Sequence, residues 1–338
     1  MKGVSVVICC YNSEKRLSPT IKHLAEQNVP DYIMWEVIVV DNNSTDNTAK
    51  IVRSLWSGYK ISETIRLRVV NENRAGLSHA RTRGMTEASF DLICFVDDDN
   101  WLNKDYLAIV YEIMTANPCI GVLGGVGVAE CEINSPEWFT SVKENYAVGK
   151  QSNVSGDISE KRGYVYGAGF VLKREILQKL ASINYSSSLT DRRENKLSAG
   201  GDSELCYLTR LAGYLIWYDE RLTFKHFIPK ERLRWEYYKK LIQGFGEARF
   251  YLEPYRIILK GGTKNYVGKN IVWLIEFWYS LYYLIQTFIF TPFSKDRKAL
   301  MADLIYQASY CKMLLIKNYT FDKNLEQIYQ LQHHLLNR

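Results

Sequence analysis

Short β-branched runs alternate with helical segments through the first hundred residues, and this alternation constrains the fold more than any other feature. The runs lie at residues 4–10, 35–40, 65–70 and 92–96. The segments between them, 13–27, 45–55 and 77–88, suit helices, with apolar residues at helical spacing or cap residues at the start. Strands separated by helical segments of this length predict an α/β fold, with a mostly parallel sheet covered by helices on both faces.

Three of the runs end in polar clusters, at the edge where a parallel sheet usually binds its ligands. The clusters are Tyr11-Asn12, Asp41-Asn42 and Asp97-Asp98-Asp99. At least two carboxylates of the triplet could reach one cation, and oxygen ligands suit Mg²⁺ or Mn²⁺, which commonly bridge phosphate oxygens. A solvated acidic turn is the structural alternative, and the triplet alone does not decide between the two.

Four motifs in this half resemble those of family 2 glycosyltransferases, in the family's order and spacing. They are VSVVICCYN at 4–12, EVIVVDNNSTD at 36–46, NRAGLSHARTRG at 73–84 and FVDDD at 95–99. The resemblance continues through 167–169, 200–205 and His226, so that it covers residues 4–228. It implies the GT-A fold of nucleotide-diphosphosugar transferases, with a nucleotide-sugar half over about 1–100 and an acceptor half over about 101–230.

The resemblance implies the transfer of a sugar from a nucleotide diphosphate to an acceptor hydroxyl. A divalent cation, Mn²⁺ or Mg²⁺, would stabilise the departing diphosphate. Asp99 is implied as the principal metal ligand, and Asp97 as a ligand of the metal or of the ribose. Asp98 would either contact the nucleotide or hold the turn. His226 would complete the metal or diphosphate site, with a hydrogen-bonded core histidine as the alternative.

Four further residues are implied in binding the donor nucleotide. Tyr11 and Asn12 would contact the base and the ribose. Asp41 would accept a hydrogen bond from the base, which favours a UDP-sugar as the donor. Arg81 would offset the charge of the phosphates. Thr82 stands where the family often has asparagine, and this departure puts one hydrogen bond to the nucleotide in doubt.

The base of an inverting transfer is implied by the family's second acidic motif. Asp202 matches that motif and would take the proton of the acceptor hydroxyl as its oxygen attacks. Gly201 replaces the first acid of the motif, and Glu204 is therefore the nearest rival of Asp202. A helix is predicted at 203–212, so an aspartate that caps its N-terminus is the structural alternative.

Charged and aromatic residues divide the chain near residue 230. Residues 231–338 hold 16 basic and 9 acidic side chains, whereas residues 1–230 hold 27 and 28. The last third also contains 22 of the 45 Phe, Tyr and Trp residues. We therefore predict a glycosyltransferase domain over 1–230 and a basic, aromatic helical region over 231–338 that associates with a membrane.

The apolar run at 271–293 is long enough to span a bilayer. A polar stripe follows one helical face of this run: Glu276, Ser280, Tyr283, Thr287 and Thr291. Because a carboxylate inside a span is unfavourable, a helix that lies in the interface of an anionic membrane fits better. Spanning and burial against the protein body are the alternatives. With no secretory signal at the N-terminus, we expect a cytoplasmic protein on the cytoplasmic face of the membrane.

The leading function is an inverting, metal-dependent glycosyltransferase that acts on a glycan or a lipid-linked oligosaccharide. A polyprenyl-phosphate sugar synthase is one alternative, although that group usually ends in clear spanning helices. A nucleotide-binding scaffold without transfer activity is the other, and the intact acidic motifs argue against it. The basic aromatic region also suggests nucleic acid as a partner. No recognisable nucleic-acid module accompanies it, and we expect no nucleic-acid partner.

Overall fold

The computed structural model describes residues 2–336 except 184, 186, 188, 190–199, 262–270 and 292–295. Lys264, Lys269 and Lys295, which are basic residues on either side of the apolar run at 271–293, lie outside the described residues, as do residues 292 and 293 of the run. Contacts divide the chain into two compact units. Unit 1 is Met1–Glu132, Glu144–Tyr185 and Tyr214–Ile228, and unit 2 is Ile133–Lys143, Ser186–Gly213 and Pro229–Arg338. Two segments from before residue 230 therefore belong to the unit that holds the C-terminal helices.

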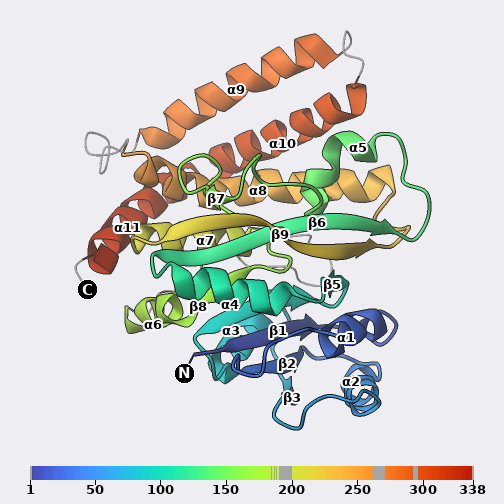
Figure 1. Ribbon diagram of the computed structural model, residues 1–338. Helices are drawn as coiled ribbons and strands as arrows, with labels where there is room; N and C mark the ends of the chain where they lie inside the picture. Colours follow the sequence, from blue (N-terminus) through green and yellow to red (C-terminus); the bar gives the residue numbers. More distant parts are fainter. Residues whose placement is uncertain are drawn as a thin grey trace. The chain divides into compact units, whose positions relative to one another are not determined.

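The described strands of unit 1 form one nine-stranded sheet (Figure 1). They are β1 (Val4–Cys10), β2 (Trp35–Asp41), β3 (Arg66–Asn71), β4 (Leu92–Asp97), β5 (Asn100–Leu102), β6 (Ile120–Cys131), β7 (Gly156–Asp157), β8 (Val171–Lys173) and β9 (Leu215–Ile228). The order is β3-β2-β1-β4-β8-β6-β9-β5, with β7 paired to β9. The first four strands are parallel, as predicted. Beyond them β8 is antiparallel to both neighbours, so the sheet is mixed.

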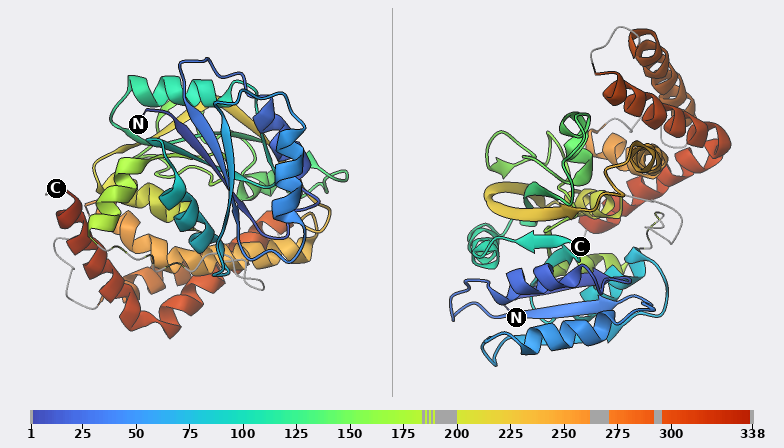
Figure 2. Two further views of the ribbon diagram at one scale, coloured as in Figure 1. Left: turned by 90° about the horizontal axis from the view of Figure 1, so that it is seen from below. Right: turned by 90° about the vertical axis from the view of Figure 1, so that its right-hand side faces the viewer.

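Helices cover both faces of the parallel half, whose strands are drawn in blue and teal in Figure 2. The helices are α1 (Leu17–Ala25), α2 (Thr48–Ser57), α3 (Leu77–Glu87) and, further along the chain, α4 (Tyr106–Ala116). Helix α6 (Arg174–Ser182) packs on β8. Alternate residues of β1, such as Val6, pack in one core with α1, α2 and α4. The other face meets α3, and a Cβ added to Gly84 would lie 2.3 Å from Val7 Cγ1. Burial on both faces explains the unbroken β-branched runs.

Unit 2 consists mainly of helices. They are α5 (Phe139–Val142), α7 (Gly201–Leu211), α8 (Trp235–Leu259), α9 (Val272–Phe290), α10 (Arg297–Ile316) and α11 (Asn318–Leu336). Helix α10 packs on both α8 and α9, and Figure 1 shows it between them. Within the described residues, α10 is the one helix whose length and composition would allow it to cross a membrane. About a quarter (28%) of its most apolar stretch is buried. Helix α9, for which spanning was an alternative to lying in the interface, does not meet both of these conditions.

A buried carboxylate links three elements of unit 1. Glu36 Oε1 accepts hydrogen bonds from Ser5 Oγ at 2.8 Å and from the Ser89 N–H at 2.7 Å, and Oε2 lies 3.3 Å from Arg68 Nη2. Burial by itself raises the pKa of Glu36, but these hydrogen bonds and the Arg68 charge outweigh it, and the pKa is lowered.

We expect Glu36→Gln to lower the free energy of unfolding by about 1–3 kcal/mol near neutral pH. Because folding lowers the pKa of Glu36, its carboxylate stabilises the fold above the ordinary pKa of about 4.3. This stabilisation is lost as the pH falls through the folded pKa, so the difference between the two proteins should shrink in acid. Urea unfolding across this pH range measures it. Glu63→Gln, at an exposed position, is the matched control, and a difference that stays constant with pH would contradict the prediction.

Candidate active site

The carboxyl ends of β1, β2 and β4 lie at one edge of the sheet because the three strands are parallel and in register. Cys10 pairs with Asp41 on one side, and Cys9 pairs with Asp97 on the other. The residues that follow these strands therefore meet at the same edge. Unit 1 thus brings together the loop that begins at Tyr11, the end of β2 and the aspartate triplet.

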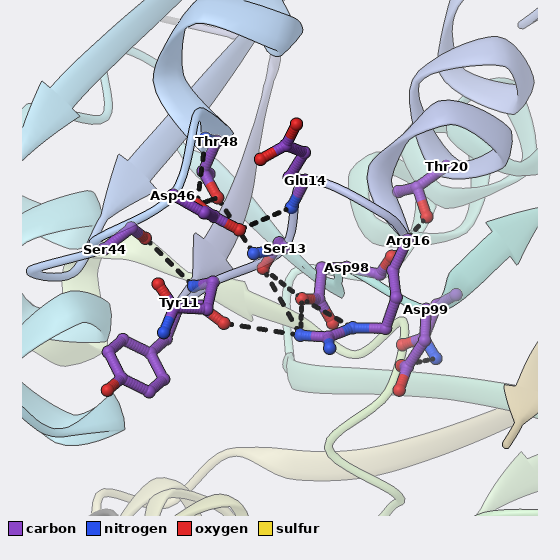
Figure 3. A network of polar contacts seen from close by, with 12 residues as sticks. Tyr11, Ser13, Glu14, Arg16, Thr20, Ser44, Asp46, Thr48, Asp98 and Asp99 are labelled. Carbon is purple, nitrogen blue, oxygen red and sulfur yellow. Dashed lines mark hydrogen bonds and ion pairs between the residues drawn. The ribbon is translucent and has the colours of Figure 1, made fainter.

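Hydrogen bonds tie the loop after β1 to the loop after β2 (Figure 3). Asn12 adopts a positive φ of 49°, and its N–H donates to Ser44 Oγ at 3.0 Å. Its side-chain oxygen accepts the Thr45 N–H at 2.8 Å. The Ser13 N–H donates to Thr48 Oγ1 at 2.8 Å. Asn12 was predicted to contact the base and the ribose, but its side-chain oxygen holds the loop after β2.

Asn42, which was not among the predicted site residues, makes the corresponding tie between the loops after β2 and β3. Its Nδ2 donates to the carbonyl oxygens of Glu72 at 3.0 Å and of Arg74 at 2.7 Å. Its Oδ1 accepts the N–H of Gly76, the residue directly before α3, at 2.9 Å. Its position directly after a buried strand was the signal that could have found it. The three loops at this edge are thus cross-linked.

Asp98 is turned toward the first loop and α1, as Figure 3 shows. Arg16 donates to its Oδ2 from Nη2 at 2.6 Å and from Nε at 3.2 Å, and Ser13 Oγ donates to the same oxygen. The carbonyl oxygen of Asp98 accepts from Thr20 Oγ1 at 2.9 Å. Burial and the charge of Asp99 raise the pKa of Asp98, and Arg16 opposes this. This geometry suits the predicted alternative, a residue that holds the turn.

Asp99 lies opposite His226, which β9 carries in register with Asn100 of β5. The distance from Asp99 Oδ1 to His226 Nε2 is 3.6 Å, and both side chains are buried. His226 Nδ1 lies 2.7 Å from the carbonyl oxygen of Tyr146. Because a carbonyl oxygen only accepts, Nδ1 donates this hydrogen bond. Nε2 is therefore the ring nitrogen that faces Asp99, and it carries a lone pair when the ring is neutral.

Asp99 and His226 could together hold a divalent cation to which the substrate supplies further ligand atoms. Within the described ranges, no group of three or more His, Cys, Asp and Glu side chains is placed to hold a metal ion. Mg²⁺ is commonly held by only one or two protein carboxylates, with substrate phosphate oxygens and water as the other ligands. Asp99 and His226 supply two donor atoms of suitable type, and the hydrogen bond of Nδ1 orients the ring as metal-binding histidines require.

Asp97 and Arg81 border the same pair of residues. Loss of water around the carboxyl and the charge of Asp99 raise the pKa of Asp97, whereas Arg81 and His226 lower it. Arg81 is buried on α3, with its guanidinium carbon 5.9 Å from the centroid of the Phe95 ring.

Tyr11 and Asp41, both predicted to contact the base, differ in their surroundings. Tyr11 is 42% exposed, and its ring extends away from the polar network in Figure 3. Asp41 Oδ1 accepts the Ser44 N–H at 3.2 Å.

Asp202 and Glu204 belong to unit 2 and differ in their surroundings. Helix α7 begins at Gly201, so Asp202 lies in the first turn of the helix and is not its cap. It is half-buried, and its Oδ1 accepts the N–H of Ser203 at 2.9 Å. Glu204 is only 3% exposed and accepts from Tyr255 Oη at 3.2 Å and from Ser187 Oγ. Of the two, Asp202 is the more accessible to a substrate.

Comparisons with known proteins identify the family and the fold of the chain. The family model described as "Glycosyl transferase family 2" matches residues 5–181. The glucosyl-dolichyl phosphate glucuronosyltransferase of Haloferax volcanii is 23% identical over 249 residues, which is 72% of this chain and 76% of that protein. The amylovoran biosynthesis glycosyltransferase AmsB of Erwinia amylovora is 29% identical over 180 residues, 52% of this chain and 57% of that protein.

Solved structures confirm the predicted GT-A fold. Residues 1–349 of TarS from S. aureus superpose with a TM-score of 0.52 and 16% identity, covering 98% of this chain and 91% of that one. The mannosyltransferase PcManGT from Pyrobaculum calidifontis, solved with GDP-Man and Mn²⁺, gives a TM-score of 0.53 and 20% identity, covering 98% and 84%. At these identities the likeness establishes the fold of the chain.

The contact between Arg16 and Asp98 predicts an energetic coupling. We expect Arg16→Ala and Asp98→Asn each to lower the free energy of unfolding by about 1–3 kcal/mol. Together they should lower it by at least about 1 kcal/mol less than the sum, because both remove the same ion pair. Urea unfolding of the four proteins measures the coupling. Arg53→Ala, on the exposed side of α2, should change stability by less than about 0.5 kcal/mol. Additive effects would show that the pair does not hold the turn.

Proposed function

Because the chain belongs to glycosyl transferase family 2, we propose that this glycosyltransferase is inverting and metal-dependent and moves a sugar from a nucleotide diphosphate to a hydroxyl. The observation that carries the proposal is the pair of donor atoms at the carboxyl edge of the sheet, Asp99 Oδ1 and His226 Nε2, 3.6 Å apart. A cation held there would neutralise charge that develops on the departing diphosphate. The residues around the pair supply the rest of the donor site.

The donor would lie across the loops that the hydrogen-bond network holds together. We assign base and ribose contacts to Tyr11 and Asp41, and a ribose or metal contact to Asp97. Arg81 supplies positive charge beside Asp97, where a diphosphate would need it. Asp41 favours uridine, so that UDP-sugars are the first donors to test. Asn12 and Asp98 act on the donor through the loops that they hold in place.

Asp202 is the base that we assign to the acceptor hydroxyl. Its carboxylate is half-buried and stays within reach of solvent, whereas Glu204 is enclosed by Tyr255 and Ser187. Glu204 therefore serves to hold α7 against α8. Asp202 also lies in the first turn of α7, where the partial positive charge of the helix N-terminus is favourable for an acidic side chain. An ionised carboxylate is the form that can accept a proton.

The acceptor that we propose is a glycan or a lipid-linked saccharide. Two relatives support this class by their names, a glucosyl-dolichyl phosphate glucuronosyltransferase and an amylovoran biosynthesis glycosyltransferase. The excess of basic over acidic residues after position 230 supports work on the cytoplasmic face of an anionic membrane. Nothing in this proposal requires nucleic acid as a partner.

The metal assignment predicts the behaviour of Asp99→Asn. We expect it to lower the Mn²⁺-dependent hydrolysis of the donor by at least about 100-fold, because the amide removes a negative ligand without changing the size of the side chain. Release of nucleoside diphosphate from UDP-glucose, UDP-N-acetylglucosamine, UDP-glucuronate and GDP-mannose measures it, with and without EDTA. Asp31→Asn, at an exposed position, is the control. Metal-dependent hydrolysis that survives in Asp99→Asn would contradict the assignment.

The base assignment predicts a separation of binding from turnover. Asp202→Asn should lower turnover by about 10²–10⁴-fold, with water as the acceptor in the same hydrolysis assay. The thermal shift that UDP and Mn²⁺ produce should stay unchanged, because Asp202 does not bind the donor in this proposal. Glu204→Gln is the matched comparison. If Asp202→Asn turns over nearly normally and Glu204→Gln does not, the base is Glu204.

A further inference from the structure

Helix α9 exposes many of its apolar side chains and turns Glu276 and Ser280 toward the protein, which is unlike an ordinary surface helix. Its exposed residues include Ile275, Trp278, Tyr282, Ile285, Phe288 and Ile289, which we call the outer face of α9. Most of them recur at intervals of three or four residues, so they lie along one side of the helix. Trp278 is 61% exposed and Phe288 69%. Contiguous apolar surface of this kind marks an interaction site.

The opposite side of α9 is polar and packs on α10. Ser280 is buried, and its Oγ donates to Gln307 Oε1 at 2.8 Å and accepts from Cys311 Sγ at 3.3 Å. Glu276 Oε2 accepts from Tyr310 Oη at 3.2 Å. Glu276 and Ser280 of the predicted polar stripe therefore face the protein. Their hydrogen bonds hold α9 in one rotational orientation about its axis.

A charged group on α8 extends this polar contact. Arg249 Nη1 donates to Gln307 Oε1 at 3.2 Å, and its guanidinium carbon lies 4.1 Å from the centroid of the Tyr310 ring. Arg249 Nε also lies 3.2 Å from Glu253 Oε2. If α9 rolled over to bury its outer face, Glu276 and Ser280 would lose these partners. The orientation with the apolar face outward is therefore the one that the packing specifies.

We propose that the outer face of α9 lies in the interface of a membrane that contains anionic lipid. Trp and Tyr among aliphatic residues are typical of the level of the head groups. The outer face itself carries no charge, while Arg297, Lys298 and Lys312 are exposed on the neighbouring α10. Met301 and Leu315 of α10 add exposed apolar surface. Such a combination of apolar area and flanking positive charge binds anionic lipid.

Charge argues for lipid over a second copy of the chain as the occupant. Residues 231–338 carry seven more basic than acidic side chains, so two copies that met through this region would repel each other. A helix of 19 residues is about 28 Å long and can lie flat in the interface. In that position Glu276 stays on the protein side, hydrogen-bonded to Tyr310, and no carboxylate enters the lipid.

Flotation of the full chain with vesicles tests the proposal. We expect the wild type to float with vesicles of phosphatidylcholine mixed with phosphatidylglycerol, and less with phosphatidylcholine alone. Trp278→Glu and Phe288→Glu should each lower the bound fraction at least about tenfold, because each places a charge in the apolar layer. Tyr32→Glu is the matched control, since Tyr32 is 76% exposed in unit 1, and it should float like the wild type. Trp278→Ser and Phe288→Ser serve if a glutamate variant does not fold.

Three results would overturn the proposal. The first is a wild type that does not float with either vesicle. The second is flotation that survives in the α9 variants, which would leave the basic charge alone as the cause. The third is a dimer in sedimentation velocity that Trp278→Glu dissociates, without vesicle binding. The inference does not rest on sugar transfer. Donor hydrolysis in the same variants should equal that of the wild type, so loss of hydrolysis and loss of flotation are separate failures.

Discussion

The parallel register of β1 with β2 and β4 is the constraint on which the rest of unit 1 depends. It aligns Cys10 with Asp41 and Cys9 with Asp97, so that three loops leave the sheet at one edge. Because the loops start close together, residues of one loop can form hydrogen bonds with residues of the next. Asn12 ties the loop after β1 to the loop after β2, Asn42 ties the loop after β2 to the loop after β3, and Arg16 holds Asp98 beside the first loop. With Asp98 turned toward α1, Asp99 is the member of the triplet that lies opposite His226.

Much of this edge could be predicted because local patterns encode it. Unbroken β-branched runs indicate strands buried on both faces. An aspartate triplet after such a run fits either a cation site or an acidic turn, and the motifs around it favour the cation. The partners of those residues could not be predicted in the same way. Arg16 and Asp98 are separated by 82 residues, and no periodicity relates them. The antiparallel pairing in the second half of the sheet was not predicted either, because the strand that makes it, β8, has only three residues, Val171–Lys173.

The polar stripe of α9 shows a different limit of sequence reasoning. Spacing identifies which residues share a side of a helix, but it does not say which side meets the protein. Here the answer depends on Gln307 and Arg249, which lie on other helices and offer hydrogen bonds to the polar side. Buried polar groups need partners, and the helix takes the rotation that supplies them. The apolar residues are left outside for this reason.

The cross-linked loops have a thermodynamic consequence for ligand capture. A loop that is ordered only on binding loses conformational entropy at that moment, and the loss weakens the complex. Asn42 joins the loops after β2 and β3 through three hydrogen bonds, and Asn12 and Ser13 join the loop after β1 to the segment after β2. Most of that ordering is therefore complete when the chain folds. Loops that are already rigid should bind a ligand quickly. They should also discriminate between ligands by shape, since they cannot adapt to a poorly matched molecule.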